Sequence, residues 1–222
     1  MRTAAKWSFG RIGTRKGGIF MQLVAEGLSG ERGGEILFSG LNFTVDAGQA
    51  LLVTGPNGVG KSTLLRIAAG LLHPTEGSVH LRGSVGEFES LGGACHFLGH
   101  MNAMKSALTL EENLRFWQSF YGIGQITVLQ ALEMVGLADI GHLPFGYLST
   151  GQKRRAGIAR LLASERPVWL LDEPTAGLDK ASESQFSGLM QSHLDAGGII
   201  LAATHLPLGL LSSRELMIRV IN

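Results

Sequence analysis

The chain reads Gly55-Pro56-Asn57-Gly58-Val59-Gly60-Lys61-Ser62-Thr63 between a short apolar run and a segment with helical spacing. This stretch satisfies the phosphate-loop pattern G-x-x-x-x-G-K-[ST], with a buried strand expected before it and a helix after it. Glycines let the backbone wrap phosphate groups with its N–H groups pointing inward, and the helix N-terminus adds a favourable dipole. A dinucleotide-binding turn fits poorly, because no third glycine follows at the required position. The stretch predicts a nucleoside triphosphate site.

The last three residues of this loop have separate expected roles. The Lys61 amine should reach the β- and γ-phosphates of ATP, which makes it a candidate catalytic group. The Ser62 hydroxyl should bind Mg²⁺, and Thr63 should lie behind the α-phosphate. ATP and Mg²⁺ are therefore the expected cofactors.

Two carboxylates follow a second apolar run, Val168–Leu171, which reads as a buried strand. Ligands of parallel sheets bind at the carboxyl ends of strands. Because neighbouring side chains on a strand face opposite ways, we expect Asp172 to hold Mg²⁺ and Glu173 to act as the general base. His205 follows another apolar strand, Gly198–Thr204, so we expect it at the same edge, near the γ-phosphate.

The rest of the chain alternates strand and helix patterns. Strands are expected at Met21–Leu28, Ile36–Val45, Ala50–Thr54 and Ser78–Arg82, and helices at Lys61–Leu72, Leu108–Tyr121, Thr127–Val135 and from Ser149 or Thr150 to Leu162. The order predicts an α/β P-loop NTPase fold, with a mostly parallel sheet and helices on both of its faces. A small antiparallel β part and an inserted helical lobe at about residues 100–148 complete the expected domain, residues 21–222.

Length and charge limit the functions that the chain can have. Its 222 residues suffice for one domain with a small inserted lobe. Five basic residues precede Glu26, and without them the net charge of +1 becomes about −4, so nothing indicates nucleic-acid binding. We expect residues 1–20 to be a disordered basic extension, with a transit peptide as the alternative. No apolar run reaches the length of a membrane span, and Cys95, as the single cysteine, excludes a disulfide scaffold.

Taken together, these motifs resemble ABC transporter ATPases over about Met21 to Val220. The segments in the family's order and spacing are Gly55–Thr63, Leu148–Gln152, Leu170–Pro174, Leu178–Asp179 and Thr204–His205. The resemblance implies that Ser149 and Gly151, with Gln152 beside them, contact the γ-phosphate bound to an opposing subunit, so that a homodimer encloses two ATP molecules. A helix start offers N–H groups and a dipole to such an anion.

Two positions depart from the general family. In the family, a glutamine that senses the γ-phosphate and Mg²⁺ is expected at the position of His100. We therefore consider His100 a candidate metal-site residue. The aromatic residue that should stack on adenine ahead of Ile36 is absent, and Arg32 lies nearby as a planar cation that could stack on the base.

A narrower resemblance is to the ATP-binding subunit of the bacterial haem exporter for cytochrome c maturation. It is carried by Ile36–Val45, Gly99–His100, Leu110–Phe116 and Thr204–Leu208. It implies a translocase ATPase that is peripheral at the cytoplasmic face of the inner membrane and energises integral membrane subunits for haem export or haem release. The alternatives are the ATPase of another exporter and a soluble ABC ATPase, which would need insertions or a second ATPase domain.

Two further patterns keep more than one interpretation. His96 and His100 are spaced i, i+4, which could indicate a metal or haem site, but Gly92 stands where a haem attachment motif needs its first cysteine. The expected helix 108–121 is aromatic, and its aromatic residues could be core or a docking surface for a membrane subunit.

Overall fold

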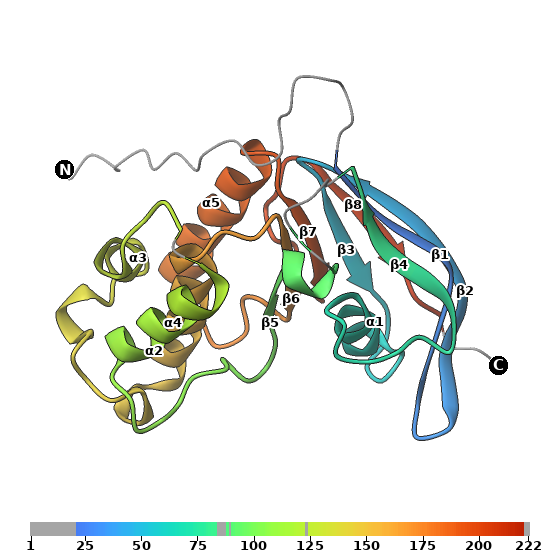
Figure 1. Cartoon of the computed structure of the whole chain (residues 1–222). Coiled ribbons are helices and arrows are strands. Elements are labelled where there is room, and N and C mark those ends of the chain that lie inside the picture. The colour runs from blue at the N-terminus through green and yellow to red at the C-terminus, as the bar shows by residue number, and fades with distance from the viewer. Residues whose placement is uncertain (1–20, 84–87, 89, 123, 220–222) are drawn as a thin grey trace.

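Five parallel strands form the centre of the computed structural model, which describes residues 21–83, 88, 90–122 and 124–219 (Figure 1). The expected basic extension, residues 1–20, lies outside the described residues. The strand order is β5-β6-β7-β3-β8, and every neighbouring pair is parallel. The strands are β5 Cys95–Leu98, β6 Val168–Asp172, β7 Ile199–Ala203, β3 Ala50–Thr54 and β8 Ser213–Met217.

A second, smaller sheet is antiparallel, as expected, with the order β2-β1-β4. Its strands are β1 Gln22–Arg32, β2 Glu35–Asp46 and β4 Glu76–Arg82. The first of them is longer than predicted and ends at Arg32 rather than at Leu28. In Figure 1 this sheet and the parallel sheet enclose helix α1, Lys61–Ala68.

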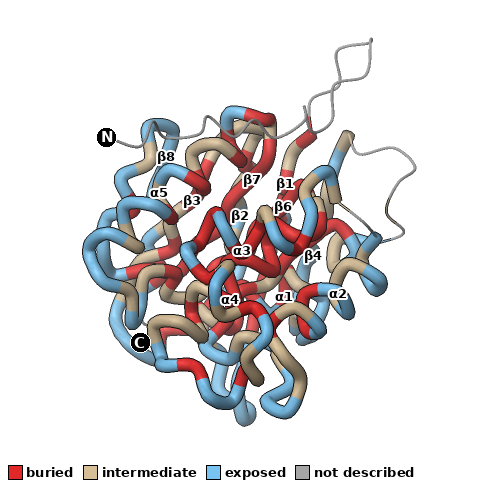
Figure 2. Tube along the Cα trace, turned by 90° about the vertical axis from the view of Figure 1, so that its left-hand side faces the viewer, coloured by how far each residue is buried: buried red, intermediate tan, exposed pale blue. Residues whose placement is uncertain are grey.

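Helices cover both faces of the parallel sheet, which confirms the expected α/β fold. On β6, Val168 and Leu170 join the core around α1, whereas Trp169 and Leu171 join the core on the opposite face. Helices α4, Thr150–Ala163, and α5, Lys180–Asp195, cover this second face (Figure 1). Alternate residues of one strand thus serve two cores, which explains its unbroken apolar sequence. Figure 2 shows the buried residues gathered on the central strands.

Two helices occupy the expected lobe, α2 Leu110–Tyr121 and α3 Val128–Met134, and both begin with capping boxes. In α2 the Thr109 hydroxyl accepts from the Glu112 N–H at 3.1 Å, and the Thr109 N–H donates to the Glu112 carboxylate at 2.7 Å. These reciprocal bonds satisfy backbone donors that the helix itself cannot pair. No helix within the described ranges combines the length and the apolar character needed to cross a membrane.

Three features of the fold correct the sequence prediction. The helix expected over Lys61–Leu72 ends at Ala68, because Gly70 takes φ 72° in the left-handed region. Leu71, which the predicted helix included, lies beyond the observed helix and is 61% exposed. Strands β5 and β8 and helix α5 have no counterpart among the predicted elements.

Candidate functional site

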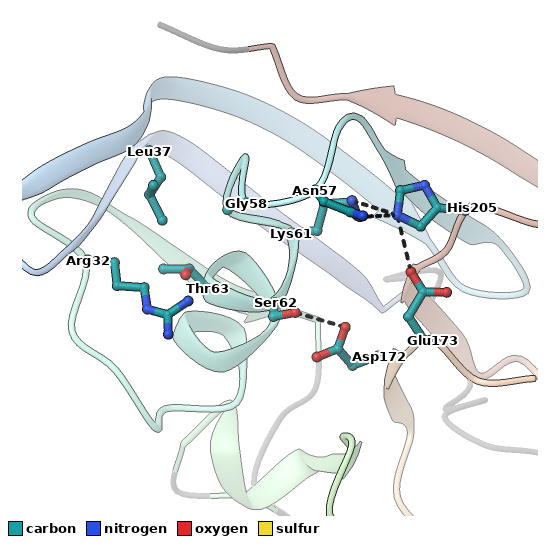
Figure 3. Close-up of a pocket in the computed structure, with 11 residues that line it drawn as sticks. Arg32, Leu37, Asn57, Gly58, Lys61, Ser62, Thr63, Asp172, Glu173 and His205 are labelled. Carbon is teal, nitrogen blue, oxygen red and sulfur yellow. Dashed lines mark hydrogen bonds and ion pairs between the residues drawn. The ribbon is translucent and has the colours of Figure 1, made fainter. Parts of the chain in front are cut away.

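A pocket of about 230 Å³ opens where β3, β6 and β7 end (Figure 3). This is the sheet edge at which the sequence predicted a nucleotide site. The lining residues are Arg32, Leu37, Asn57, Gly58, Gly60, Lys61, Ser62, Thr63, Asp172, Glu173 and His205.

The phosphate loop turns into α1 at Gly60, the N-cap residue of that helix, which has φ 109°. A side chain here would be strained, because L residues rarely adopt this backbone conformation. It would also collide with β2, since a Cβ atom at this position would lie 2.9 Å from Leu37 Cβ and from Phe38 Cδ1. Glycine at this position therefore lets the loop pack directly against the antiparallel sheet.

The Lys61 amine lies at the centre of the loop, and the residue is only 8% exposed. Its Nζ donates to the carbonyl oxygens of Gly55 at 2.8 Å and Pro56 at 3.0 Å. Lys61 Nζ also lies 3.1 Å from His205 Nε2 (Figure 3). A buried cation at the N-terminus of a helix is a strong attractor for a phosphate anion.

Ser62 and Asp172 meet on the other side of the loop. The Ser62 hydroxyl donates to Asp172 Oδ1 at 3.0 Å, although the two residues are 110 positions apart. A hydroxyl and a carboxylate oxygen side by side suit Mg²⁺, which is bound by one or two protein oxygens together with substrate phosphates and water. Within the described ranges, no group of three or more His, Cys, Asp and Glu side chains forms a metal cage.

Glu173 and His205 lie side by side at one end of the pocket (Figure 3), with 3.6 Å between Glu173 Oε1 and His205 Nε2. The same ring nitrogen lies 2.9 Å from Asn57 Oδ1. When Nε2 carries a hydrogen it donates to Asn57 Oδ1, and when it carries none it accepts from Lys61. His205 thus joins the loop cation to the candidate base.

The backbone of Glu173 is unusual. Glu173 has φ 45°, in the left-handed region, and among the described non-glycine residues only Ala103 shares a positive φ. Such conformations are strained and persist only where surrounding contacts fix them. One of these contacts is the Glu173 N–H, which donates to the Ala203 carbonyl at 2.9 Å.

Four residues expected beyond the phosphate loop, Ser149, Gly151, Gln152 and His100, lie outside this pocket. Ser149 and Gln152 close a capping box at the start of α4, where the Gln152 N–H donates to the Ser149 hydroxyl at 3.3 Å, and Gly151 lies between them. His100 is exposed and is not among the lining residues. A single chain therefore brings neither Ser149 nor His100 to the phosphate loop.

The two histidines that suggested a metal or haem site have separate environments. His96 is fully buried on β5, and its Nε2 lies 2.6 Å from the Ser164 carbonyl oxygen. Burial, together with the nearby Arg160 charge, lowers the pKa of His96 to about 3. His100 lies on the exposed segment that follows this strand. The spacing i, i+4 brings side chains together on a helix, not across a strand and a bend.

Arg32, the candidate for stacking on adenine, ends β1 and lines the pocket. Leu37 lines it too; it belongs to the stretch Ile36–Val45 that carries the narrower resemblance, but no role at the site was predicted for it from the sequence. The one available signal was its place on the strand that packs against the phosphate loop.

Comparisons with known proteins also indicate an ATP-binding protein. A sequence profile for the family described as "ABC transporter" matches residues 38–176. The cytochrome c biogenesis ATP-binding export protein CcmA of Mesorhizobium japonicum is 65% identical over 190 residues, covering 86% of this chain and 94% of that protein. The protein of the same name from Chelativorans sp. is 64% identical over 196 residues, covering 88% and 97%.

Solved structures give the same fold. A dimeric post-hydrolysis state of an ATP-binding cassette bound to ADP and Pi matches with a TM-score of 0.75 and 25% identity, over 89% of this chain and 94% of that one. A bacterial Atm1-family ABC exporter with ATP bound matches with a TM-score of 0.77 and 23% identity, over 97% of this chain and 39% of that one. The chain therefore belongs to the ABC transporter family, among the cytochrome c biogenesis ATP-binding export proteins.

Proposed function

We propose that this chain hydrolyses ATP to drive an export system for cytochrome c biogenesis, and that haem is the cargo of this system. The observation that carries the proposal is the convergence of Lys61, Asp172 and Glu173 in one pocket beside the phosphate loop. The names of the relatives support export in cytochrome c biogenesis. Haem is the group that c-type cytochromes carry, and the sequence resemblance points to it.

In the proposed reaction the phosphate loop binds the triphosphate of ATP. The Lys61 amine, which here donates to the carbonyls of Gly55 and Pro56, turns toward the β- and γ-phosphates. Backbone N–H groups of the loop and of the start of α1 would bind the same anion, with Thr63 behind the α-phosphate. These groups stabilise charge that grows on the phosphate oxygens in the transition state.

Ser62 and Asp172 are the proposed holders of Mg²⁺. Their 3.0 Å contact sets two oxygens side by side at the mouth of the loop, which fits the oxygen ligands that this ion prefers. Mg²⁺ bound there would neutralise charge on the phosphate groups. Asp172 and Ser62 also orient each other, so each keeps the other in place for binding.

Glu173 and His205 are the proposed groups that act on the attacking water. Glu173 takes the proton from this water as general base. His205, whose Nε2 lies 3.6 Å from Glu173 Oε1, donates to the γ-phosphate beside this carboxylate. His205 also lies 3.1 Å from Lys61 Nζ, so the phosphate-binding and proton-accepting sides of the pocket are joined.

A second copy of the chain completes the proposed site. Ser149 is exposed at the N-terminus of α4, and Gly151 and Gln152 are partly exposed beside it. None of the three lines the pocket of its own chain. The Ser149 hydroxyl, the Gly151 N–H and the helix dipole are suited to an anion that a second copy presents. The similar ATP-binding cassette with ADP and Pi is dimeric, which supports this arrangement.

The proposed membrane partners are the integral subunits of the same export system. The outer face of α2 offers Phe116, 48% exposed, and Phe120, 68% exposed, while Trp117 and Tyr121 are partly buried. This helix therefore combines core packing with an exposed aromatic patch suited to an interface. The proposed location is peripheral, at the cytoplasmic face of the inner membrane.

The test is complementation of a strain that lacks this gene, with mature c-type cytochromes as the readout. The wild-type chain should restore them, and Glu173→Gln should not, although the purified variant should still bind ATP and accumulate as a dimer. Restored cytochromes with Glu173→Gln would refute the catalytic assignment. If the wild-type chain hydrolyses ATP but does not restore the cytochromes, the assignment of haem as the cargo is wrong.

A further inference from the structure

Arg154 on α4 donates four hydrogen bonds to backbone carbonyls, and it is only 6% exposed. Its Nε donates to Pro174 at 3.1 Å and its Nη1 to Gly99 at 2.7 Å. Its Nη2 donates to both Asp172 at 3.0 Å and Glu173 at 2.6 Å. One planar guanidinium thus holds the end of β6, the following turn and the segment after β5.

The two carbonyls that share Nη2 belong to the peptide groups on either side of the Glu173 Cα atom. The orientation of these two groups defines φ and ψ of Glu173, whose φ of 45° lies in the left-handed region. A donor that binds both oxygens at once therefore stabilises this strained conformation directly. The Glu173 N–H bond to Ala203 fixes the same residue from the side of β7.

Arg154 remains a cation although it is buried. Burial lowers its pKa to about 10, and the nearby Asp172 and Glu173 carboxylates oppose this shift. The charge strengthens each of its bonds to a carbonyl oxygen. Arg154 is not among the residues that line the pocket, so it has no direct path to ATP in its own chain.

The face of α4 that carries Arg154 is pressed against β5 and the segment after it. At Gly157 a Cβ atom would lie 2.7 Å from Asn102 Oδ1 and 2.9 Å from Leu98 Cδ1. One turn further on, Arg160 Nη2 donates to the Phe97 carbonyl at 2.6 Å. This close approach brings the Arg154 guanidinium within reach of its carbonyl partners.

We propose that Arg154 is a positioning residue for Glu173, which it holds in the backbone conformation that aims its carboxylate into the pocket. The inference rests on the proposed function, in which Glu173 is the general base. Because Arg154 follows Ser149 and Gly151 on the same helix, it also ties the start of α4 to the catalytic loop. Loss of Arg154 should slow hydrolysis without weakening ATP binding.

The test compares Arg154→Gln with Arg155→Gln in the purified full chain. Arg155 is the next residue of α4, and its Nη1 donates to the carbonyls of Val135 at 3.1 Å and Gly136 at 3.2 Å, away from the pocket. Arg154→Gln should lower kcat about 100-fold, because displacement of a catalytic group by about 1 Å can cost that much. The KM and the Kd for ATP should stay within about threefold, and Arg155→Gln should keep the wild-type kcat.

Arg154→Lys is a second variant for the case that Arg154→Gln does not fold. It keeps the buried positive charge. A lysine has a single donor nitrogen and cannot bridge all four carbonyls, so an intermediate kcat with unchanged ATP affinity is expected. If ATP affinity and kcat fall by the same factor, Arg154 only stabilises the fold, and the inference is wrong.

Glu173→Gln, measured in parallel, distinguishes failure of the positioning role of Arg154 from failure of the proposed base role of Glu173. If Glu173→Gln is inactive while Arg154→Gln turns over at the wild-type rate, the positioning role is wrong and the proposed function stands. If Glu173→Gln remains active, the base assignment itself is wrong.

Discussion

Ser62 Oγ and Asp172 Oδ1 lie 3.0 Å apart, and this hydrogen bond joins the start of α1 to the end of β6. The bond links the phosphate loop to the first of the two acids that follow the central strand. It also gives Asp172 a fixed orientation at the mouth of the pocket (Figure 3). The pair is therefore the place at which we propose that Mg²⁺ binds.

Asp172→Asn should weaken the response of this protein to Mg²⁺ more than its affinity for nucleotide alone. The amide keeps the shape of the side chain but removes the charge that attracts a divalent ion. We expect the Mg²⁺ concentration for half-maximal ATPase activity to rise about 10- to 100-fold. Binding of ATP in EDTA should stay unchanged. An unaltered Mg²⁺ titration would contradict the role of Asp172, and Ser62→Thr, which keeps the hydroxyl, is the control.

Lys61→Ala should abolish ATP turnover, because it removes the cation that stabilises the transferred phosphoryl group. Lys61→Arg should also fail, since its planar guanidinium cannot replace a compact ammonium that donates to Gly55 and Pro56. Phosphate release by the purified protein is the measurement. Undiminished release by Lys61→Ala would refute the assignment.

The phosphate loop and the carboxylate pair could be predicted from the sequence because each is a local pattern. Val168–Leu171 is apolar at every position, since the strand serves cores on both faces. Asp172 and Glu173 follow it directly, and the sheet edge then fixes their place near Ser62. Parallel strands end at a shared edge, so the order of motifs along the chain sufficed to predict one site.

The missed elements lack such local signals. Strand β5 has only four residues and includes His96, whose burial depends on its bond to the Ser164 carbonyl. Strand β8 lies at the edge of the sheet and is mostly exposed, so Ser213–Met217 shows no apolar run. Helix α5 is rich in polar residues, and its start is marked by the Asp179 carboxylate, which accepts from the Ser182 N–H at 2.8 Å.

The role proposed for Arg154 could not be found from the sequence for a different reason. An arginine in a helix rich in Arg and Lys is typical of a solvated surface. Its partners Gly99 and Glu173 lie 55 and 19 positions away, and they meet Arg154 only in the folded chain. The left-handed backbone of Glu173 is equally invisible in a sequence.

Gly198→Ala should destabilise the fold, because the His193 ring lies directly over this glycine. A Cβ atom at position 198 would lie 2.2 Å from His193 Nε2. The ring cannot retreat, since it is stacked on Trp169 with 4.1 Å between centroids. Overpacking of this kind lowers the free energy of unfolding by about 1–3 kcal/mol.

Urea denaturation measures this effect, with Gly188→Ala as the matched control. Gly188 lies inside α5, and a Cβ atom there meets nothing within 4 Å. This control should raise the free energy of unfolding by about 0.5–1 kcal/mol, because alanine is the better helix former. Equal stability of the two variants would contradict the packing described for His193.

His193→Leu should reduce the sensitivity of the fold to acid. Burial disfavours the charged ring and lowers the pKa of His193 to about 3, whereas in the unfolded chain the pKa is near 6.5. The unfolded chain therefore binds a proton that the folded chain refuses, so the contribution is complete above pH 6.5 and is lost as the pH falls toward 3. From pH 7 to pH 5 the loss amounts to about 2 kcal/mol for one such histidine. Urea denaturation at both pH values should show a drop smaller by that amount in His193→Leu, whereas His142→Gln, at an exposed histidine, should show the wild-type drop. An equal drop in all three proteins would mean that His193 accepts its proton without unfolding.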